Sequence, residues 1–311
     1  MRARRTKIGA AIGPASESPA AFHKLFNGSL RQEFFPAVER WWRIHRRDLP
    51  WRRTSDPYRI FVSEVMLQQT QVARVVPAYR AFLRRFPSVR QLAAADQAAV
   101  IRCWVGLGYN RRARALHRAA QMIASEYRDQ MPLSLETLYG LPGVGEYTAR
   151  AVLVFAKDAP LLPLDTNIRR VLIRHFGQRT PRDLQIFADG LARRRGGRNL
   201  AQMLMDFGAL VCTSRRPRCV TLGLSHVAEA LPVPRQKPFV NSDRFYRGRI
   251  VAVLSRSRSV LAVTELRRRI AAPGIGQIPM TRLRRILGAL DREAIIDFSL
   301  RAKKVRLANG R

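Results

Sequence analysis

The stretch LYGLPGVGEYTARAVLVFAKDAPLLPLDTNIRRVL at residues 138–172 decides the fold of this chain. Within it, LPGVG separates two segments of helical pattern, and Gly143 and Gly145 permit positive φ angles and a close approach of the backbone to another molecule. A helix that begins after such a turn presents unpaired N–H groups and the positive end of its dipole, which together bind phosphate. An ordinary helix-helix turn would use the same residues, so LPGVG alone leaves both interpretations open.

An aspartate follows the turn within the same stretch. Asp165 lies 20 residues beyond Gly145, in PLDTNIRRVL. Capping of the next helix is the ordinary role of an aspartate before such a segment. The combination of the turn, Asp165 and the earlier segment SEVMLQQT at residues 63–70 favours a functional role instead.

Apolar residues recur at spacings of three and four from Phe34 to about Cys212. No convincing strand interrupts this pattern, so we expect a mostly α-helical domain over residues 31–230. Residues 1–30 lack the periodicity and are expected to form a basic, flexible arm. The polar segment 231–243 contains several prolines and is expected to be a linker.

The character of the sequence changes after this linker. Residues 244–311 combine helical segments such as TELRRRI with the alternating, strand-like segments RIVAVL (249–254) and VLAV (260–263). We expect a small α+β module, with a winged-helix topology as the first hypothesis. A purely structural cap would show a similar pattern.

Charge is the unusual feature of the composition. Lys and Arg number 57 against 22 Asp and Glu, which gives a formal net charge of +35 over 311 residues. A nucleic acid is the expected partner, because neutralising its phosphates releases counterions and adds affinity for any base sequence. An arginine-rich genome is the alternative explanation of the charge.

Other bulk properties restrict the class of protein. No apolar run approaches the ~20 residues needed to span a bilayer, and the basic N-terminus lacks a continuous apolar stretch. Three cysteines, an odd number, argue against a disulfide framework. We therefore expect a cytoplasmic, monomeric protein with no membrane partner, associated with the nucleoid if the chain is bacterial.

Five segments together resemble a known family. They are PWR at 50–52, DPYRIFVSEVMLQQTQV at 56–72, WVGLGYNRRARALH at 104–117, LPGVGEYTARAV at 141–152 and LDTNIRRVL at 164–172. In this order, within residues 34–220, they resemble the helix-hairpin-helix (HhH-GPD) DNA glycosylases, and among these the MutY-type adenine glycosylases. The resemblance implies a two-lobed helical domain that extrudes a nucleotide from double-stranded DNA and hydrolyses the bond to its base.

The resemblance assigns the chemistry to two carboxyl groups. Glu64, which has apolar neighbours, would be kept protonated by burial and would protonate the departing adenine. A buried structural or capping carboxylate is the alternative for Glu64. Asp165 would stay ionised and stabilise the cation-like sugar. Tyr147, the third expected catalytic residue, stands where bifunctional relatives of the endonuclease III type carry a Schiff-base lysine, which implies a monofunctional hydrolase without strong strand cleavage.

The resemblance also assigns DNA contacts. Gln69 and Tyr109 would fill the gap left by the extruded nucleotide, and packing at a helix start is the alternative for Tyr109. The expected DNA-binding residues are Gln69, Thr70, Tyr109, Leu141, Gly143, Val144, Gly145, Arg215 and Arg216. The expected base pocket consists of Trp51, Arg52 and Leu67.

The chain departs from the family in its cysteines. Most adenine glycosylases bind a [4Fe-4S] cluster through four cysteines spaced C-x6-C-x2-C-x5-C. Cys212 and Cys219 match the first two positions, but Leu222 and Ala228 occupy the other two, and His226 is out of register. Two thiolates cannot hold such a cluster by themselves. We therefore expect no cofactor and interpret the cysteine pair as the remnant of a cluster motif. A [4Fe-4S] cluster is the alternative only if other residues replace the two missing ligands.

Two further departures concern the substrate. Residues 244–311 show no signature of the Nudix-like domain with which adenine glycosylases often read 8-oxoguanine. Thr166 stands where the adenine family more often has glycine, a feature shared with thymine-mismatch glycosylases. We expect removal of adenine opposite G or 8-oxoguanine, because SEVMLQQTQV is closer to the adenine group. A T:G or U:G mismatch glycosylase and a catalytically inactive DNA-binding protein are the alternatives.

Overall fold

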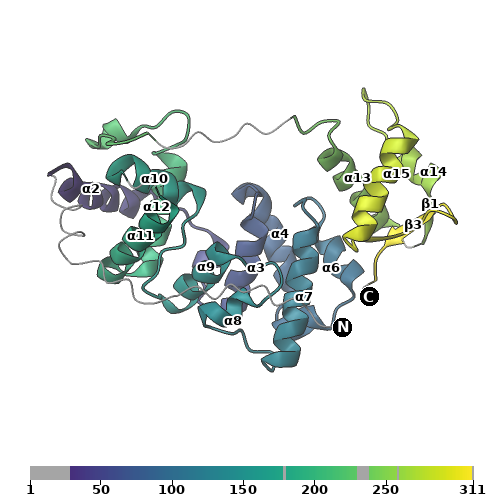
Figure 1. Cartoon of the computed structure of the whole chain (residues 1–311), viewed down its shortest axis with the longest axis horizontal. Coiled ribbons are helices and arrows are strands. Elements are labelled where there is room, and N and C mark those ends of the chain that lie inside the picture. The colour runs from purple at the N-terminus through teal and green to yellow at the C-terminus, as the bar shows by residue number, and fades with distance from the viewer. Residues whose placement is uncertain (1–28, 178–179, 230–237, 258, 310–311) are drawn as a thin grey trace. The chain divides into compact units, whose positions relative to one another are not determined.

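The structure is a computed structural model that describes residues 29–177, 180–229, 238–257 and 259–309. Residues 1–28 of the expected arm and residues 231–237 of the expected linker lie outside the described residues. The described chain is mostly helical with a small sheet near its C-terminal end, as the sequence predicts (Figure 1). Within these ranges, no helix is both long and apolar enough to cross a membrane.

The contacts divide the chain into two units, which are described separately. The first unit comprises the described residues of Met1–Arg46, Thr166–Phe187 and Met203–Leu231. The second unit comprises those of Arg47–Asp165, Ala188–Gln202 and Pro232–Arg311. The helices up to residue 210 are α2 (Ser29–His45), α3 (Pro57–Leu67), α4 (Val72–Arg85), α5 (Val89–Ala93), α6 (Gln97–Trp104), α7 (Arg111–Glu126), α8 (Leu135–Tyr139), α9 (Glu146–Lys157), α10 (Thr166–Phe176), α11 (Pro181–Arg195) and α12 (Gly197–Leu210).

Aromatic side chains form the core of the first unit. The ring centroid of Phe34 in α2 lies 5.1 Å from that of Phe176 in α10 and 5.7 Å from that of Phe207 in α12, and all three rings are buried. The indole nitrogen of Trp42 also donates a hydrogen bond of 2.9 Å to the buried Asp206. Edge-to-face ring pairs stabilise a core beyond their area of burial. This core holds α10 against α12.

Helix α3 is buried on nearly every side within the second unit. Asp56 caps its N-terminus by accepting hydrogen bonds from the backbone N–H groups of Tyr58 and Arg59, and a proline occupies the first turn, where its missing N–H is not needed. Every residue of 60–66 is buried. A helix that is apolar all round belongs in a core, so its single carboxyl group, Glu64, is held away from water.

The C-terminal part of the second unit has the α+β composition that the sequence predicts. Its elements are α13 (Asp243–Arg256), β1 (Leu261–Ala262), α14 (Val263–Arg269), α15 (Met280–Arg292), β2 (Ile296–Ser299) and β3 (Lys304–Leu307). The sheet is antiparallel, with strand order β1-β3-β2. A helix, a strand, two helices and a two-stranded hairpin follow one another in the order of a winged helix, which agrees with the first hypothesis.

The segment RIVAVL, interpreted as strand-like from its alternation, is instead part of helix α13. Its residues Ile250, Val251 and Leu254 are buried together with Tyr246. These positions are one, three and four residues apart, so they lie on one helical face. The serine before the helix caps it by accepting a hydrogen bond from the N–H of Phe245. A segment of six residues is too short to distinguish the two-residue period of a strand from the period of a helix.

Helix α6 shares a core with this C-terminal module. Ala98 and Ile101 of α6 belong to the same hydrophobic cluster as buried residues of α13, α15 and the sheet. The side-chain amide of Gln97 donates a hydrogen bond of 2.7 Å to the backbone oxygen of Ala294. Because burial of apolar surface stabilises the packing of both partners, α6 and the module depend on each other.

Candidate active site

A buried carboxyl group and a phenol meet where α3 packs against α9. Glu64 of α3 is only 3% exposed. Tyr147 lies in the first turn of α9, directly after the LPGVG turn. Its hydroxyl donates a hydrogen bond of 2.9 Å to Oε2 of Glu64. The phenol therefore fixes the orientation of the carboxyl group and engages one of its two oxygens.

Burial changes the acidity of both groups. Burial raises the pKa of Glu64 from 4.5 to about 7. Three smaller effects act on the same pKa: the hydrogen bond from Tyr147 lowers it, the charge of Asp165 raises it, and the charge of Arg52 lowers it. Burial also raises the pKa of Tyr147 well above its ordinary value, so the phenol stays protonated and remains a donor. A carboxyl group that titrates near neutral pH can act as a general acid and then as a general base.

Asp165 ends the non-helical segment between α9 and α10 and is half-buried. This segment is anchored by Asp189, which is 8% exposed. Oδ1 of Asp189 accepts a hydrogen bond of 3.0 Å from the N–H of Leu162, and both carboxylate oxygens accept from Nη1 of Arg150 at 2.9 Å. A shielded, charge-assisted contact of this kind is stronger than one in water. It fixes the backbone three residues before Asp165.

The LPGVG turn has the backbone geometry that its glycines predict. Gly143 has φ 78°, and a Cβ at this position would stand 2.7 Å from the Cβ of Ala115 in α7, so a side chain here would strain the turn. A Cβ on Gly145 would meet nothing within 4 Å, which leaves the N-terminus of α9 open to another molecule. Leu141 is 2% exposed, so its side chain belongs to the core and a DNA contact there would involve the backbone.

A buried arginine that was not identified from the sequence, Arg112 of α7, holds the loops around Gln69 and Tyr109. Its two terminal nitrogens donate to oxygens at the end of α3 and in the turn after α6, at distances from 2.5 to 3.2 Å. The acceptors are the backbone oxygens of Val65, Met66, Gln68, Leu107 and Gly108 and the hydroxyl oxygen of Thr70. The guanidinium carbon also lies 5.6 Å from the ring centroid of Tyr109.

Gln69 and Tyr109 both have left-handed backbone conformations. Their φ angles are 54° and 48°, in a region that non-glycine residues rarely occupy. Such a conformation costs on the order of 1 kcal/mol and persists only where the surroundings enforce it. Arg112 supplies that enforcement, because its acceptors lie on both sides of Gln69 and directly before Tyr109.

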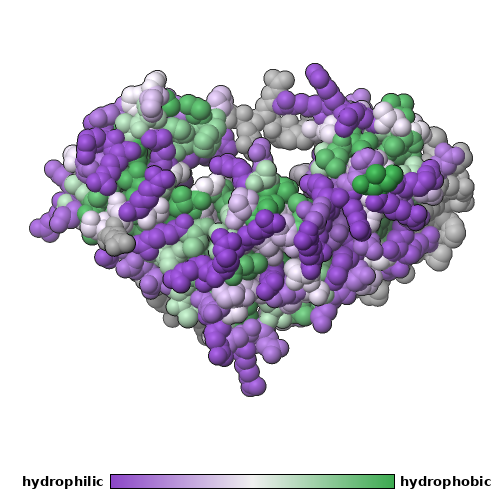
Figure 2. All heavy atoms as spheres, turned by 180° about the vertical axis from the view of Figure 1, so that it is seen from behind, coloured by the Kyte–Doolittle hydropathy of each residue, from purple (hydrophilic) through white to green (hydrophobic). Residues whose placement is uncertain are grey.

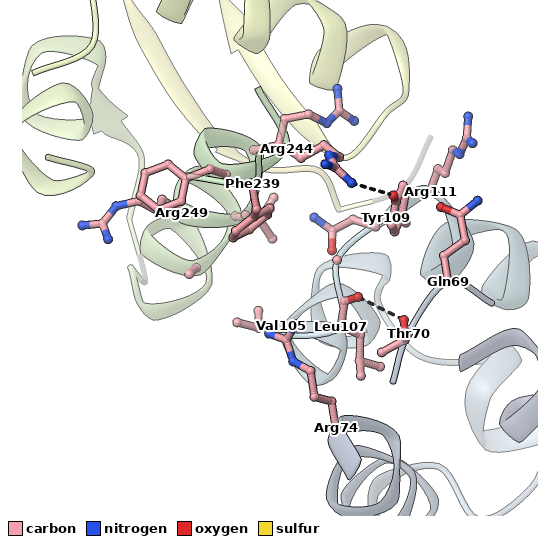
Figure 3. Close-up of a pocket in the computed structure, with 18 of the residues that line it drawn as sticks. Gln69, Thr70, Arg74, Val105, Leu107, Tyr109, Arg111, Phe239, Arg244 and Arg249 are labelled. Carbon is pink, nitrogen blue, oxygen red and sulfur yellow. Dashed lines mark hydrogen bonds between the residues drawn. The ribbon is translucent and has the colours of Figure 1, made fainter. Parts of the chain in front are cut away.

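A pocket of about 800 Å³ lies beside these loops within the second unit. Its lining includes Gln69, Thr70, Arg74, Tyr109, Phe239, Arg244 and Arg249. Figure 3 shows Arg244 and Tyr109 pointing toward each other, and a hydrogen bond of 3.4 Å joins the guanidinium to the phenol oxygen. Amide, guanidinium and aromatic groups are the side chains that contact bases and phosphates in nucleic-acid complexes.

Comparisons with known proteins agree with this geometry. Residues 62–191 match the HhH-GPD superfamily of base excision DNA repair proteins. The adenine DNA glycosylase of Mycolicibacterium smegmatis is 42% identical over 239 residues, which cover 73% of this chain and 82% of the relative. The chain belongs to the adenine DNA glycosylase family.

Two further similarities extend this result. The human adenine DNA glycosylase is 39% identical over 221 residues, which cover 65% of this chain and 40% of the human protein. Among solved structures, a thermostable thymine-DNA glycosylase is 29% identical, with a TM-score of 0.57 over 62% of this chain and 93% of that one. A non-covalent endonuclease III–DNA complex is similar in fold, with a TM-score of 0.56 at 19% identity over 64% of this chain and 95% of that chain.

Three residues of this adenine glycosylase are expected to form the base pocket. They lie near α3. Trp51 is 7% exposed and its ring centroid lies 5.5 Å from that of Tyr79, so it belongs largely to the core. Arg52 donates a hydrogen bond of 3.1 Å to the backbone oxygen of Arg47. The positive charge of Arg52 lowers the pKa of Glu64 in α3. Leu67 is half-buried at the end of α3. Electrostatics thus connect Arg52 to the site, and its role stays a prediction.

The expected DNA contacts are distributed over both units of the glycosylase. Those in the second unit are Gln69, Thr70, Tyr109, Leu141, Gly143, Val144 and Gly145. Arg215 and Arg216 lie in the first unit, in the loop between the two cysteines, and are exposed. Except for Leu141, each of these residues is exposed or half-buried and is accessible to a ligand.

The cysteine pair of the glycosylase lies in the first unit, where two histidines join it. One ligand atom from each of His175, Cys212, Cys219 and His226 lies within 4.8 Å of the others. Both cysteines are buried free thiols. The structure therefore contains a Cys/His cluster of possible metal-binding residues. The sequence interpretation as a remnant missed His175, which lies on α10 far from the motif, and treated His226 as out of register.

Proposed function

We propose that this protein is a monofunctional DNA glycosylase of base excision repair that extrudes a mispaired adenine and hydrolyses its bond to deoxyribose. The observation that carries the proposal is the buried Glu64, whose pKa of about 7 and hydrogen bond from Tyr147 prepare it to donate a proton. Membership of the adenine DNA glycosylase family supports the choice of base.

Glu64 would supply the proton that adenine needs in order to leave. Adenine is a poor leaving group as an anion, so its ring must be protonated as the bond to the sugar breaks. Oε2 of Glu64 accepts from Tyr147, which leaves Oε1 to carry the proton toward the base. The bonding electron pair stays with the adenine, which departs as a neutral molecule, and the sugar becomes an oxocarbenium ion.

Asp165 would stabilise this cation. An ionised carboxylate near the anomeric carbon lowers the energy of a positively charged sugar, either electrostatically or through a transient bond. Water then adds to the anomeric carbon, and the proton that it loses returns to the Glu64 carboxylate. The influence of Asp165 on the pKa of Glu64 supports the proposal that the two groups act on one substrate.

Tyr147 supports hydrolysis without strand cleavage. A Schiff base requires an amine, and the corresponding position here is a phenol whose hydroxyl is engaged with Glu64. We therefore assign Tyr147 to positioning and tuning Glu64, and expect little or no trapping of a covalent DNA adduct by borohydride.

The open N-terminus of α9 would bind a DNA phosphate, and the exposed arginines would add affinity that is independent of base sequence. Hydrophilic side chains are spread over the visible face in Figure 2, in keeping with the net charge of +35. We propose that Gln69 and Tyr109 enter the duplex and that the adjoining pocket, with Arg244, contacts the base opposite the adenine. Guanine and 8-oxoguanine both present acceptors that an arginine can bind.

A mismatch glycosylase for T:G or U:G is the second candidate. The observation that favours it is the 29% identity to a thymine-DNA glycosylase of the same fold. The presence of both expected catalytic carboxyl groups argues against an inactive DNA-binding protein.

Single-turnover assays on duplexes with A:G, A:8-oxoG, T:G and U:G pairs test these proposals. We expect removal of adenine from the first two, and a large loss of rate in Asp165→Asn. The exposed Asp183→Asn serves as the matched control and should cleave like the wild type. Equal rates for Asp165→Asn and wild type would contradict the mechanism, and removal of thymine or uracil alone would establish the second candidate.

We propose that this chain does not bind the family's [4Fe-4S] cluster, because it lacks two of the four cysteines of the cluster motif. Leu222 and Ala228 stand where its third and fourth cysteines would be, and Cys103 lies on α6 in the other unit. No step of the proposed reaction uses a cofactor. We further propose that the protein acts as a monomer on double-stranded DNA in the cytoplasm, or on the nucleoid if it is bacterial.

A further inference from the structure

The cluster of two thiols and two imidazoles in the first unit has no part in the proposed reaction. Its members come from different segments: His175 from α10, Cys212 from the turn after α12, Cys219 from the 3-10 helix Cys219–Leu222, and His226 from the loop that follows. The spacing of the last three is C-x6-C-x6-H. We propose that these four residues bind a single zinc ion in a closed, tetrahedral, structural site.

The distances between the ligand atoms suit one ion. Tetrahedral Zn²⁺ has ligands at about 2.3 Å for sulfur and about 2.0 Å for nitrogen, so neighbouring ligand atoms stand about 3.3 to 3.8 Å apart. The four atoms here already lie within 4.8 Å of one another, and a small contraction completes the site. In an iron-sulfur cluster the ligands bind different irons, so their separation also includes the distance between the metals.

His175 is prepared as a ligand by its hydrogen bond. Its Nδ1 lies 3.1 Å from the backbone oxygen of Ser225, which can only accept, so Nδ1 carries the proton. Nε2 therefore bears the lone pair, as a metal ligand must. Nε2 of His175 is buried and has no hydrogen-bond partner among the described residues. His175 as a whole is only 5% exposed. An unpaired buried nitrogen costs free energy unless something binds it.

The backbone holds His226 beside His175. The N–H groups of Val227 and Ala228 both donate to the backbone oxygen of Arg174, at 2.7 and 3.2 Å. The two imidazole rings are thereby brought to a centroid distance of 5.0 Å at an interplanar angle of 79°. His226 is the exposed member of the set, so it can close the site from the solvent side.

Arg174 completes the surroundings of the thiols. Its Nη1 donates to Sγ of Cys212 at 3.6 Å and to the backbone oxygen of Thr213 at 2.6 Å, while Nη2 donates to the backbone oxygen of Ser214 at 3.0 Å. N–H groups directed at a sulfur ligand stabilise its thiolate form and are typical of the shell around a metal site. Zinc binding would release the two thiol protons and leave a site without net charge, which can be buried beside an arginine.

The site would order the basic loop between its cysteines. Arg215 and Arg216 lie on this loop, and its two ends would be attached to the same ion. Because all four positions are filled by protein, the ion has no open coordination site for water or substrate. The zinc therefore acts on structure and on DNA affinity rather than on the bond that is cleaved.

The experiment measures metal in the full-length protein, purified under reducing conditions and then exposed to Zn²⁺ or Co²⁺ alone. We expect about one zinc ion per chain by elemental analysis, and for Co²⁺ the intense visible absorption of a tetrahedral site with thiolate ligands. His226→Ala, at an exposed position, should fold normally and lose most of this metal and absorption. Cys212→Ser should do the same, whereas Cys103→Ser, the half-buried cysteine of α6, should keep one equivalent.

Three results would overturn the proposal. They are the absence of bound metal, iron with a matching amount of inorganic sulfide, and a Cys212–Cys219 disulfide in the protein as isolated under reducing conditions. Full zinc content in His226→Ala would also contradict the proposed ligand set. None of these measurements depends on glycosylase activity, so the metal site and the proposed function succeed or fail separately.

Discussion

Replacing Glu64 by glutamine should strongly lower the rate of base removal and at the same time stabilise the protein above neutral pH. The substitution keeps the shape of the side chain and an oxygen that can accept from Tyr147, but it removes the proton that titrates. Loss of a general acid typically lowers a rate by about 10² to 10⁴ fold. The effect on stability follows from the burial of the group.

The magnitude comes from the pKa of Glu64. A pKa of about 7 in the folded protein, against 4.5 for an ordinary glutamate, means that burial disfavours the ionised form by about 3 kcal/mol. Below pH 4.5 both folded and unfolded states are protonated, and the group has no effect. As the pH rises from 4.5 to about 7, the unfolded state ionises while the folded state stays protonated, so the folded state becomes relatively less stable; above this range both states are ionised and the cost is constant. The neutral amide of the Glu64→Gln variant escapes this cost at every pH.

Thermal unfolding from pH 5 to pH 8.5 measures the difference. The melting temperature of Glu64→Gln should be close to that of the wild type at pH 5 and higher at pH 8.5, by roughly 2 °C for each kcal/mol. Glu126→Gln, at an exposed position, is the matched control and should follow the wild type throughout. If the curves of Glu64→Gln and wild type stay parallel across this range, Glu64 does not have the raised pKa on which the mechanism depends.

Two more substitutions probe the surroundings of Glu64. Tyr147→Phe removes the hydrogen bond that lowers the pKa of Glu64, so the fall of single-turnover activity at alkaline pH should move to higher pH; a shift to lower pH would refute this role. Arg112→Lys leaves buried backbone oxygens unpaired at about 1 to 3 kcal/mol each, so both the melting temperature and the cleavage rate should fall while the alkaline limit stays in place. Arg118→Lys, at an exposed position of the same helix, should leave all three unchanged, and equal behaviour of the two variants would show that Arg112 positions nothing.

The parts of the site that were predictable depend on local requirements. The turn needed glycine at position 143 because the backbone has positive φ and another helix lies against it, and this need is visible in five residues of sequence. Glu64 could be placed in an apolar environment because most of its neighbours along α3 are apolar, among them Val62, Val65 and Met66. The alternation of RIVAVL was also a local signal, but it was compatible with two periods and so gave the wrong element.

What could not be predicted depends on packing between distant segments. The arginines at 111, 112 and 114 look alike in the sequence, and only the fold decides that Arg112 is buried against the end of α3. His175 reaches the cysteine pair because the aromatic core holds α10 against α12, and no spacing within the motif indicates that contact. Glu64 and its partner Tyr147 were therefore accessible from the motifs, while Arg112 and His175 were not.

The shared core of α6 and the C-terminal module has a consequence for protein engineering. Ala98 and Ile101 on α6 are as much a part of the module's interior as its own helices. If another domain replaced this module at the linker, the side chains of Ala98 and Ile101 and the amide of Gln97 would be left facing water. A graft at this position must therefore include a new surface for α6.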